Sequence, residues 1–244
     1  MRVIVPAAGL GSRLRPFTDT RPKALFPVDG RPLLATTLER FAAAGVDEVV
    51  CVSGHLGDVL ERELLACAPR PELRFVRNTR YATTNSIVSL SLTRRWWSED
   101  FCVVDSDVCF TRELLDRLLS ASGDTLVVDT SKEWAAIEMH VELRDGAVSY
   151  LDKELPPERS AGEFFGLSRW TPAGAAVFTR SIDRLLARGH SDVWYEFAIR
   201  DAAADLHLRV VEASADEWAE IDAPEDEESV SRLVRRERLS AAAE

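Results

Sequence analysis

The sequence has few residues of the kinds that build zinc or redox centres. It contains four cysteines and four histidines among 244 residues. No two cysteines form a C-x-x-C pair, and no two histidines have the H-x-x-x-H spacing of a zinc site on a helix. Cys51 and Cys102 lie within apolar runs, where a thiol behaves as a small hydrophobic side chain. This pattern argues against a zinc site and is typical of a reducing cytoplasm.

Long hydrophobic runs are also missing. No stretch approaches the roughly 18 apolar residues that a membrane-spanning helix needs. The N-terminal run M-R-V-I-V-P-A-A-G is short and meets glycine and arginine at once, without the extended hydrophobic region or cleavage site of a signal peptide. We therefore expect a cytoplasmic protein without a membrane partner, whose first residues form a buried strand.

Basic residues are outnumbered by acidic ones, 30 against 41, but are concentrated at the N-terminus. The net charge is −11, which argues against nucleic acid as a partner because binding a phosphate backbone favours a basic face. Residues 1–23 nevertheless hold five cations against one acid, a balance of +4, whereas residues 216–228 hold eight acids and no base. A basic, glycine-rich N-terminus in an acidic protein suits a small anion, while most of the acidic run is typical of a solvated surface.

Hydrophobic periodicity predicts alternating strands and helices, and therefore an α/β fold with a largely parallel sheet and right-handed crossovers. No repeat or linker divides the chain, and we expect one domain. Residues 137–151 alternate around Asp145-Gly146, which predicts a hairpin. The other predicted strands are 2–6, 48–53, 73–77, 101–105, 125–128, 163–170 and 207–212, and the predicted helices are 33–44, 57–66, 85–93, 111–121, 172–187, 193–204 and 224–239.

The residues after the first predicted strand can bind an anion. Gly9 and Gly11 allow a tight turn that brings bare backbone amides close to a negative charge. Arg13 can make a bidentate contact to phosphate oxygens, and Lys23, stiffened by Pro22, adds a point charge. The third glycine of a dinucleotide-binding loop and a Walker G-K-S/T are both missing. Together these groups can neutralise a triphosphate and stabilise a departing pyrophosphate.

The run A-A-G-L-G-S-R-L-R-P-F-T-D-T-R-P-K-A-L-F-P-V-D-G-R-P-L-L resembles the N-terminus of the nucleotidyltransferases that make activated sugars and activated alcohols. The resemblance implies a GT-A-like, Rossmann-like fold with a mostly parallel central sheet flanked by helices. It implies that Arg13 and Lys23 are the catalytic contacts to the triphosphate. It also implies nucleotide contacts from Ala7, Ala8, Gly9, Gly11, Ser12, Arg13, Asn85 and Asp105.

Three aspartates bear on a divalent metal site. Asp105 and Asp107 end the predicted strand 101–105, where alternation along an extended chain would put both side chains on the same side. Carboxylate oxygens suit Mg²⁺, which typically binds one or two carboxylates together with substrate phosphates. By resemblance, Asp107 and Asp222 would share Mg²⁺ between the α-phosphate and the acceptor phosphate. The anionic acceptor oxygen would then attack the α-phosphorus in line, without a strong base.

Motifs in the middle of the chain indicate which branch of these nucleotidyltransferases the sequence resembles. Residues 76–92 are similar to the N-x-x-Y-x-x-x-N-x-x-S-L pattern of the phosphocholine cytidylyltransferase branch, which includes enzymes acting on inositol 1-phosphate and on phosphonates. K-E-W (132–134), G-E-F-F-G-L (162–167) and W-Y-E (194–196) continue the likeness. The branch implies CTP and a small phosphorylated or phosphonate acceptor. Thr83-Thr84 stand where the branch often has a second Asn, which leaves the preference for CTP open.

Five residues are candidates for the acceptor site. Aromatic rings can hold a quaternary ammonium by cation–π contact, a lysine adds an anionic contact that favours a phosphonate or polyol phosphate, and an acid can bind a cationic or hydroxyl-bearing tail. Packing or surface roles remain the alternative for each. The candidates are Trp134, Lys153, Trp194, Tyr195 and Glu196. Within the single domain 1–244, we expect a nucleotide-binding core at about 1–130, an acceptor-binding portion with mixed sheet at about 131–212, and a metal-ligand strand and helix at about 213–244.

Three other functions fit parts of the sequence. A sugar-1-phosphate nucleotidyltransferase keeps the same chemistry, although the short chain and the N-S-I-V-S-L segment argue against it. Asp105-Ser106-Asp107 also fits the D-x-D motif of a GT-A glycosyltransferase, which leaves the Arg13 and Lys23 loop unexplained because no pyrophosphate departs. A non-catalytic nucleotide-binding module would not require these cations and aspartates to be intact. A homodimer is compatible with the sequence, which does not fix the oligomeric state.

Overall fold

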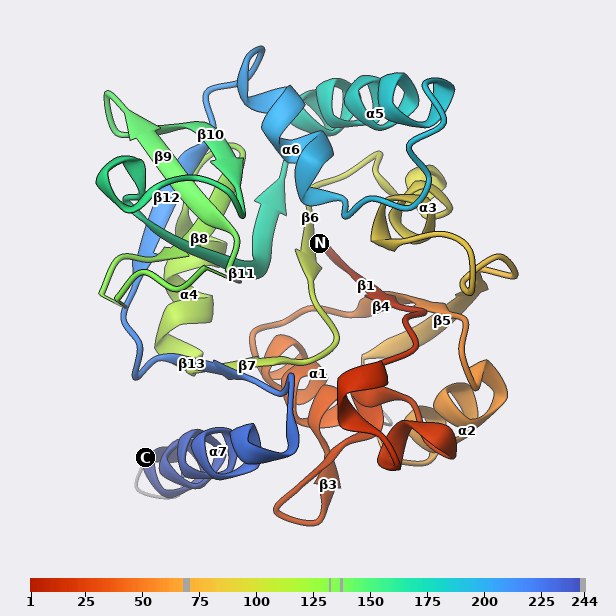
Figure 1. Cartoon of the computed structure of the whole chain (residues 1–244). Helices are drawn as coiled ribbons and strands as arrows, with labels where there is room; N and C mark the ends of the chain where they lie inside the picture. The colour runs from red at the N-terminus through yellow and green to blue at the C-terminus, as the bar shows by residue number, and fades with distance from the viewer. Residues whose placement is uncertain (68–70, 132, 137, 242–244) are drawn as a thin grey trace.

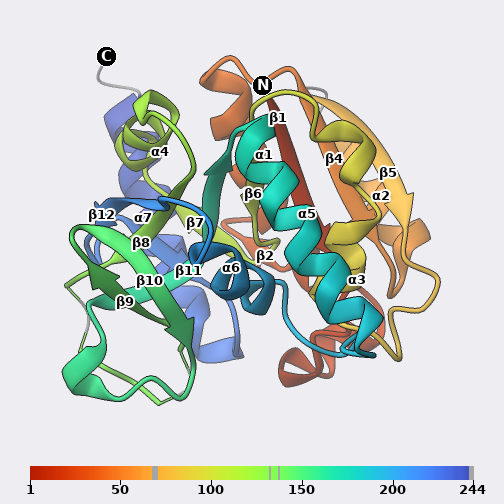
Figure 2. The ribbon, with the colours of Figure 1, turned by 90° about the horizontal axis from the view of Figure 1, so that it is seen from above.

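A nine-stranded sheet with helices on both faces forms the centre of the molecule (Figures 1 and 2). The computed structural model describes residues 1–67, 71–131, 133–136 and 138–241. None of the helices within these ranges is long and apolar enough to cross a membrane. The sheet combines a parallel part, built mainly from the first half of the chain, with an antiparallel extension built from the second half.

Four parallel strands form the first part of the sheet. They are β1 (Arg2–Ala7), β4 (Glu48–Ser53), β5 (Glu72–Arg77) and β6 (Phe101–Val104), connected by α1 (Leu33–Ala43), α2 (Gly57–Cys67) and α3 (Ser86–Ser91). Their order is β5-β4-β1-β6, so β1 lies between two parallel neighbours. This arrangement confirms the α/β class and the parallel sheet expected from the sequence.

One long antiparallel strand joins this part to the rest of the sheet. That strand is β11 (Gly162–Trp170), which pairs with β6 and, across a bulge, with β8 (Thr125–Asp129). The predicted hairpin is present and turns at Asp145-Gly146. Its strands are β9 (His140–Arg144) and β10 (Ala147–Asp152), and β12 (Arg209–Ala213) pairs parallel to β8.

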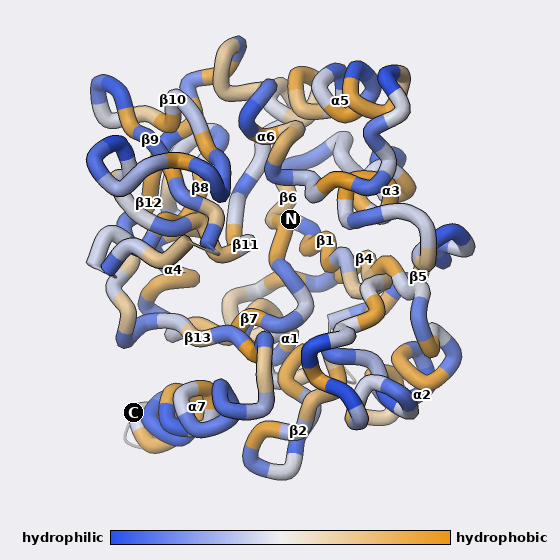
Figure 3. The backbone as a smooth tube through the Cα atoms, in the orientation of Figure 1, coloured by the Kyte–Doolittle hydropathy of each residue, from blue (hydrophilic) through white to orange (hydrophobic). Residues whose placement is uncertain are grey.

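Alternation along the central strands explains why helices cover both faces. In β1, Val3 and Val5 pack into the core under α1, α2 and α4 (Arg112–Ser120), whereas Ile4 packs into the opposite core. That second core lies under α3, α5 (Pro172–Ala187) and α6 (Glu196–Ala203). A strand that is buried on both sides therefore reads as a continuous apolar run. Figure 3 shows hydrophobic residues along β1 and β4, while the surface helices alternate between hydrophobic and hydrophilic residues.

Two very short strands form a separate antiparallel ladder that the sequence did not predict. They are β7 (Val108–Phe110) and β13 (Trp218–Glu220), and Val108 pairs with Glu220. The backbone amide of Ile221 extends the ladder by donating to the Asp107 carbonyl at 3.0 Å. α7 (Glu227–Ala241) packs on the ladder and on the two-residue strand β2 (Pro27–Val28), which pairs with β3 (Arg31–Pro32). The ladder brings a late segment of the chain against the turn that follows β6.

The starts of two helices agree with the signals in the sequence. The Thr111 hydroxyl caps α4 by accepting a hydrogen bond from the Leu114 amide at 3.2 Å, as expected. Pro224 starts a short 3-10 turn that leads into α7. The expectation of an extended chain from Asp105 to Asp107 was wrong, because β6 ends at Val104 and the next residues form a turn before β7. Strand alternation therefore does not determine where these two carboxylates lie.

Candidate active site

A cleft of about 440 Å³ opens where β1 and β6 end. This is the carboxyl edge of the parallel strands, where ligands usually bind in α/β sheets. Every predicted site residue except Ala8 and Trp134 lines the cleft. The predicted residues that it brings together are Ala7, Gly9, Gly11, Ser12, Arg13, Lys23, Asn85, Asp105, Asp107, Lys153, Trp194, Tyr195, Glu196 and Asp222.

The two exceptions, Ala8 and Trp134, make their contacts outside the cleft. Ala8 is buried, and its carbonyl accepts a hydrogen bond from the His55 amide at 3.1 Å. Trp134 stacks on His140, with ring centroids 5.0 Å apart, and donates its indole N–H to the Leu155 carbonyl at 3.1 Å. It lines a neighbouring pocket and not this cleft, so its role as an acceptor contact stays a prediction. Lys132 of the K-E-W motif lies outside the described residues.

Lys23 lies between two aspartates at the base of the cleft. Its ammonium is 2.5 Å from Asp107 Oδ2 and 2.5 Å from Asp222 Oδ1, and Arg13 contacts Asp222 Oδ2 at 2.8 Å. Burial lowers the pKa of Lys23, but the charges and hydrogen bonds of both aspartates outweigh it and raise the pKa above its ordinary value. Although burial opposes it, Lys23 holds the pKa of Asp222 below its ordinary value. Lys23 and Asp222 therefore both carry their charges at neutral pH.

The two glycines of the N-terminal loop have different structural roles. Gly11 has φ +61°, and its carbonyl accepts hydrogen bonds from the Thr18 hydroxyl and the Leu14 amide. A Cβ on Gly11 would lie 2.9 Å from Thr18 Cγ2 and 3.0 Å from Lys23 Cβ, so glycine lets the loop fold closely over Lys23. At Gly9 an added Cβ would have no atom within 4 Å. Gly9 therefore leaves free volume in the cleft next to its backbone.

Asp105 differs from Asp107 in its surroundings. Its amide donates to the Gly166 carbonyl at 3.0 Å, and its carboxylate packs directly against Gly166. Gly166 has φ +89°, and a Cβ there would lie 2.2 Å from Asp105 Oδ2. Burial, followed by the nearby charges of Glu196 and Asp107, raises the pKa of Asp105 well above its ordinary value. The two acids of the D-x-D triplet are thus a half-buried carboxyl packed against Gly166 and a lysine-paired carboxylate.

Asn85 joins the start of α3 to the loop before α6. Its Oδ1 accepts from the Ser86 amide at 2.7 Å, and its Nδ2 donates to the Asp192 carbonyl at 3.3 Å. The Ser86 hydroxyl in turn accepts from the Tyr195 amide at 2.9 Å. The N-S-I and W-Y-E motifs, far apart in sequence, therefore form one unit at the edge of the cleft. The contact of Asn85 with a nucleotide stays a prediction.

The predicted acceptor residues form the opposite wall. Tyr195 is 1% exposed, whereas Trp194 is 40% exposed and carries the Lys153 ammonium 4.6 Å from its ring centroid. One carboxylate oxygen of Glu196, Oε2, is buried and has no hydrogen-bond partner among the described residues. Burial outweighs the opposing effects of a backbone hydrogen bond and Lys153, and it raises the pKa of Glu196 to about 7.

Sequence reasoning missed a group of three glutamates in the cleft. Carboxylate oxygens of Glu138, Glu163 and Glu220 lie within 4.8 Å of one another. Burial and the charges of Asp107 and Asp222 raise the pKa of Glu220 to about 8. Two of the three stood in segments already singled out, Glu163 in G-E-F-F-G-L and Glu220 two residues before Asp222. No signal in the sequence pointed to Glu138.

Comparisons with known proteins show what the chain is similar to. Residues 3–193 match the sequence profile of the MobA-like NTP transferase domain. The chain is 32% identical over 246 residues to a CMP-5'-(3-aminopropyl)phosphonate synthase of Streptomyces rubellomurinus, covering 93% of this chain and 38% of that protein. It is 26% identical over 241 residues to a choline-phosphate cytidylyltransferase of Streptococcus pneumoniae, covering 97% of this chain and 100% of that protein.

The fold also has solved counterparts. The inositol-1-phosphate CTP transferase of T. maritima superposes with a TM-score of 0.79 at 20% identity, covering 95% of both chains. The chain thus spans less than half the length of the phosphonate relative and the whole length of the choline-phosphate relative. These comparisons confirm the resemblance and the fold class predicted from the sequence.

Replacing Gly166 tests whether Asp105 requires a glycine beside it. Gly166→Ala should lower the free energy of unfolding by more than Gly189→Ala, because Gly189 has a matching φ of +85° but nothing within 4 Å of an added Cβ. The positive φ alone should cost about 1–2 kcal/mol at either position. Urea unfolding measures both losses, and equal losses would show that Asp105 moves aside freely.

The half-buried acid Glu196 should affect how the stability of the protein depends on pH. Its pKa rises from 4.5 to about 7 on folding, so the folded protein retains a proton that the unfolded chain releases. This stabilisation is complete below about pH 4.5 and is lost as the pH rises through 7. The difference in unfolding free energy between the unaltered protein and Glu196→Gln should therefore fall across this range. Glu158→Gln, at an exposed acid, is the control substitution. A flat difference for Glu196→Gln would contradict the prediction.

Proposed function

Because the chain belongs to the MobA-like NTP transferase domain family, we propose that it transfers CMP from CTP to a small phosphonate or phosphorylated acceptor and releases pyrophosphate. The observation that carries this proposal is the convergence of Lys23, Arg13, Asp107 and Asp222 beneath the glycine loop in one cleft. The names of the two relatives, a CMP-phosphonate synthase and a choline-phosphate cytidylyltransferase, support CTP as the nucleotide. Residues 1–130 would bind the nucleotide, and residues 131–212 would hold the acceptor.

The cations of the N-terminal loop suit a triphosphate. Lys23 remains charged because its pKa is raised, so it contributes charge and does not transfer a proton. Arg13 is 64% exposed at the cleft and can present its guanidinium to phosphate oxygens. Both side chains would stabilise the negative charge that develops on the departing pyrophosphate.

The two aspartates fit a magnesium ion. One ammonium lies 2.5 Å from an oxygen of each carboxylate, so both carboxylates converge on a single position that accepts a cation. Hard oxygen donors are the ligands that Mg²⁺ prefers. The Lys23 ammonium occupies this position in the structure, so magnesium would be held by Asp107 and Asp222 once Lys23 turns to the triphosphate. The ion would then neutralise charge on the reacting phosphates. The role of the chain itself is to orient the acceptor oxygen, which is already anionic, in line with the α-phosphorus.

The acceptor end of the cleft favours an aminoalkyl phosphonate over phosphocholine. An aromatic cage for a quaternary ammonium needs several exposed rings. Of the three predicted aromatic residues, Trp134 lines the neighbouring pocket and Tyr195 is buried. The ring of Trp194 is already in contact with the Lys153 ammonium. Lys153 can contact a phosphonate oxygen, and the carboxylates around Glu220 complement a primary ammonium.

Pyrophosphate release with Mg²⁺ tests this function directly. We would pair CTP, UTP, GTP, ATP and dTTP with 2-aminoethylphosphonate, 3-aminopropylphosphonate, phosphocholine, inositol 1-phosphate and glucose 1-phosphate. The highest kcat/KM is expected for CTP with an aminoalkyl phosphonate. Preference for phosphocholine would contradict the proposed acceptor, preference for glucose 1-phosphate would move the protein to the sugar branch, and no release with any pair would refute the proposed transfer.

Asp107→Asn tests the metal assignment. It should lower kcat by on the order of 10² while the fold stays intact, because the neutral amide is a poor magnesium ligand of the same size. Asp116→Asn on the exposed surface of α4 is the control and should leave kcat unchanged. Near-full activity of Asp107→Asn with Mg²⁺ would show that Asp107 does not bind the metal.

A further inference from the structure

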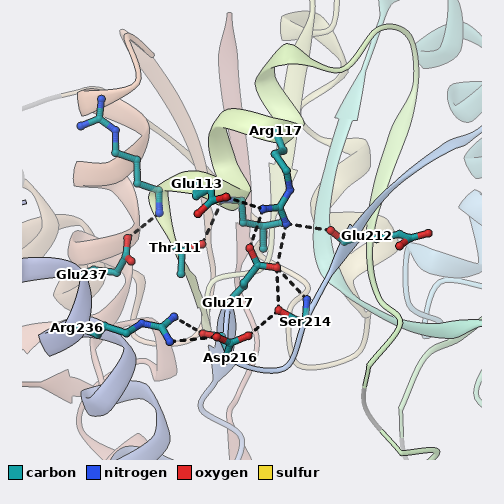
Figure 4. Close-up of polar contacts among 11 residues, drawn as sticks. Thr111, Glu113, Arg117, Glu212, Ser214, Asp216, Glu217, Arg236 and Glu237 are labelled. Atoms are coloured by element: carbon teal, nitrogen blue, oxygen red, sulfur yellow. Dashed lines mark hydrogen bonds and ion pairs between the residues drawn. The ribbon is translucent and has the colours of Figure 1, made fainter. Parts of the chain in front are cut away.

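The loop before β13 is held by three elements that lie outside the cleft. Residues 214–217 connect β12 to β13 and contact α4, Thr111 after β7, and α7 (Figure 4). None of these contact residues lines the cleft, and the function proposed above uses none of them. The loop is followed directly by β13, which ends at Glu220, and Asp222 lies two residues further along the chain.

Glu217 is the residue on which these contacts converge. Its carboxylate accepts two hydrogen bonds from the Arg117 guanidinium, at 2.7 and 3.0 Å, and two more from the amide and hydroxyl of Ser214, both at 3.0 Å. The hydrogen bond from Arg117 is the main reason why the pKa of Glu217 is lowered, although burial opposes it. Such bidentate pairs fix geometry as well as charge.

The same pair is tied to the neighbouring backbone. Arg117 also donates to the Glu212 carbonyl at 3.0 Å, so one guanidinium joins α4, β12 and the loop. The Glu217 carbonyl accepts from the Thr111 amide at 2.7 Å, and Thr111 follows β7 directly. Glu217 is therefore held through its side chain by α4 and through its backbone by the residue after β7.

From this point the β7–β13 ladder runs straight to the two aspartates. Trp218 pairs with Phe110 and Glu220 with Val108, and the ladder ends where the Ile221 amide donates to the Asp107 carbonyl. Asp107 precedes β7, and Asp222 follows β13. One end of the ladder is thus the contact of Thr111 with Glu217, and the other is the aspartate pair.

Other contacts of the loop are weaker candidates for this role. Arg236 on α7 pairs with Asp216 at 3.3 Å, but both side chains are exposed, by 46% and 72%. Exposed pairs contribute little in water. Glu113 contacts Arg117 at 3.8 Å and is 84% exposed. Glu217 is 18% exposed, which leaves the Arg117–Glu217 pair as the best-shielded ion pair of the loop.

We propose that Arg117 and Glu217 are positioning residues, which set the separation of Asp107 and Asp222 through the β7–β13 ladder and so set their affinity for a divalent cation. This inference rests on the proposed function, because it assumes that the two aspartates hold the metal. Neither residue would touch substrate or metal. Their effect would pass through hydrogen-bonded backbone, as for the outer partners that orient metal ligands.

Arg117→Met tests the inference in two independent ways. The Kd for Mn²⁺ alone, measured by electron paramagnetic resonance on the purified protein, should rise about three- to tenfold, below the effect of a direct ligand partner. The Mg²⁺ concentration that gives half-maximal pyrophosphate release should rise by the same factor, while kcat at saturating Mg²⁺ changes less. Loss of packing alone would not produce this separation of metal affinity from kcat.

Conservative variants and a matched control sharpen the test. Arg117→Lys keeps the charge but loses the bidentate geometry, so it should restore part of the affinity. Glu217→Gln keeps the size of the side chain and replaces Arg117→Met as the test if that variant does not fold. Arg159→Met removes another bidentate pair, with Glu142 at 3.0 and 2.7 Å, which lies away from the ladder and should alter neither metal measurement.

The outcomes separate this inference from the proposed function. Equal Mn²⁺ affinity in the unaltered protein and folded Arg117→Met would overturn the positioning role alone, as would an equal loss in Arg159→Met. Mn²⁺ binding by the unaltered protein without pyrophosphate release would refute the proposed reaction and leave the positioning role standing on the binding data. No Mn²⁺ binding by the unaltered protein would overturn both the positioning role and the metal assignment.

Discussion

The shared ammonium of Lys23 is the interaction on which the arrangement of the cleft depends. A lysine that is 15% exposed is costly to bury without opposite charges, and here two carboxylates from different parts of the chain neutralise it. The loop after β1, the turn after β6 and the segment after β13 must therefore meet at one point. Gly11 lets the N-terminal loop pack closely against Lys23, and the pairing of β7 with β13 brings Asp222 close to Asp107.

Features encoded by local sequence could be predicted. The parallel strands follow from apolar runs that are buried on both faces, and the caps of α3 and α4 follow from Asn85 and Thr111. The glycine loop could be interpreted because glycine and the cations act within a few residues of one another. Asp222 was identified only by resemblance, since nothing in its own segment distinguishes it from the neighbouring surface acids.

Features decided by distant contacts could not be predicted. β7 and β13 have three residues each, too few for a periodic pattern, and exist because they pair with each other. The turn at Asp107 interrupts an alternation that the sequence alone favours. Trp134 resembles an acceptor contact in its motif, but stacking on His140 and a hydrogen bond to Leu155 direct its ring into a separate pocket. Which aromatic faces a cleft depends on tertiary packing, which the motif does not contain.

The ladder between β7 and β13 also has a consequence for the order in which the protein assembles. Its two strands lie in the middle and near the end of the sequence, so their pairing closes a long loop. During synthesis, the parallel strands and their helices can pack while β13 is still inside the ribosome. The aspartate pair forms only after Asp222 has emerged. A nascent chain would therefore have a nearly complete core before Asp107 and Asp222 meet at Lys23.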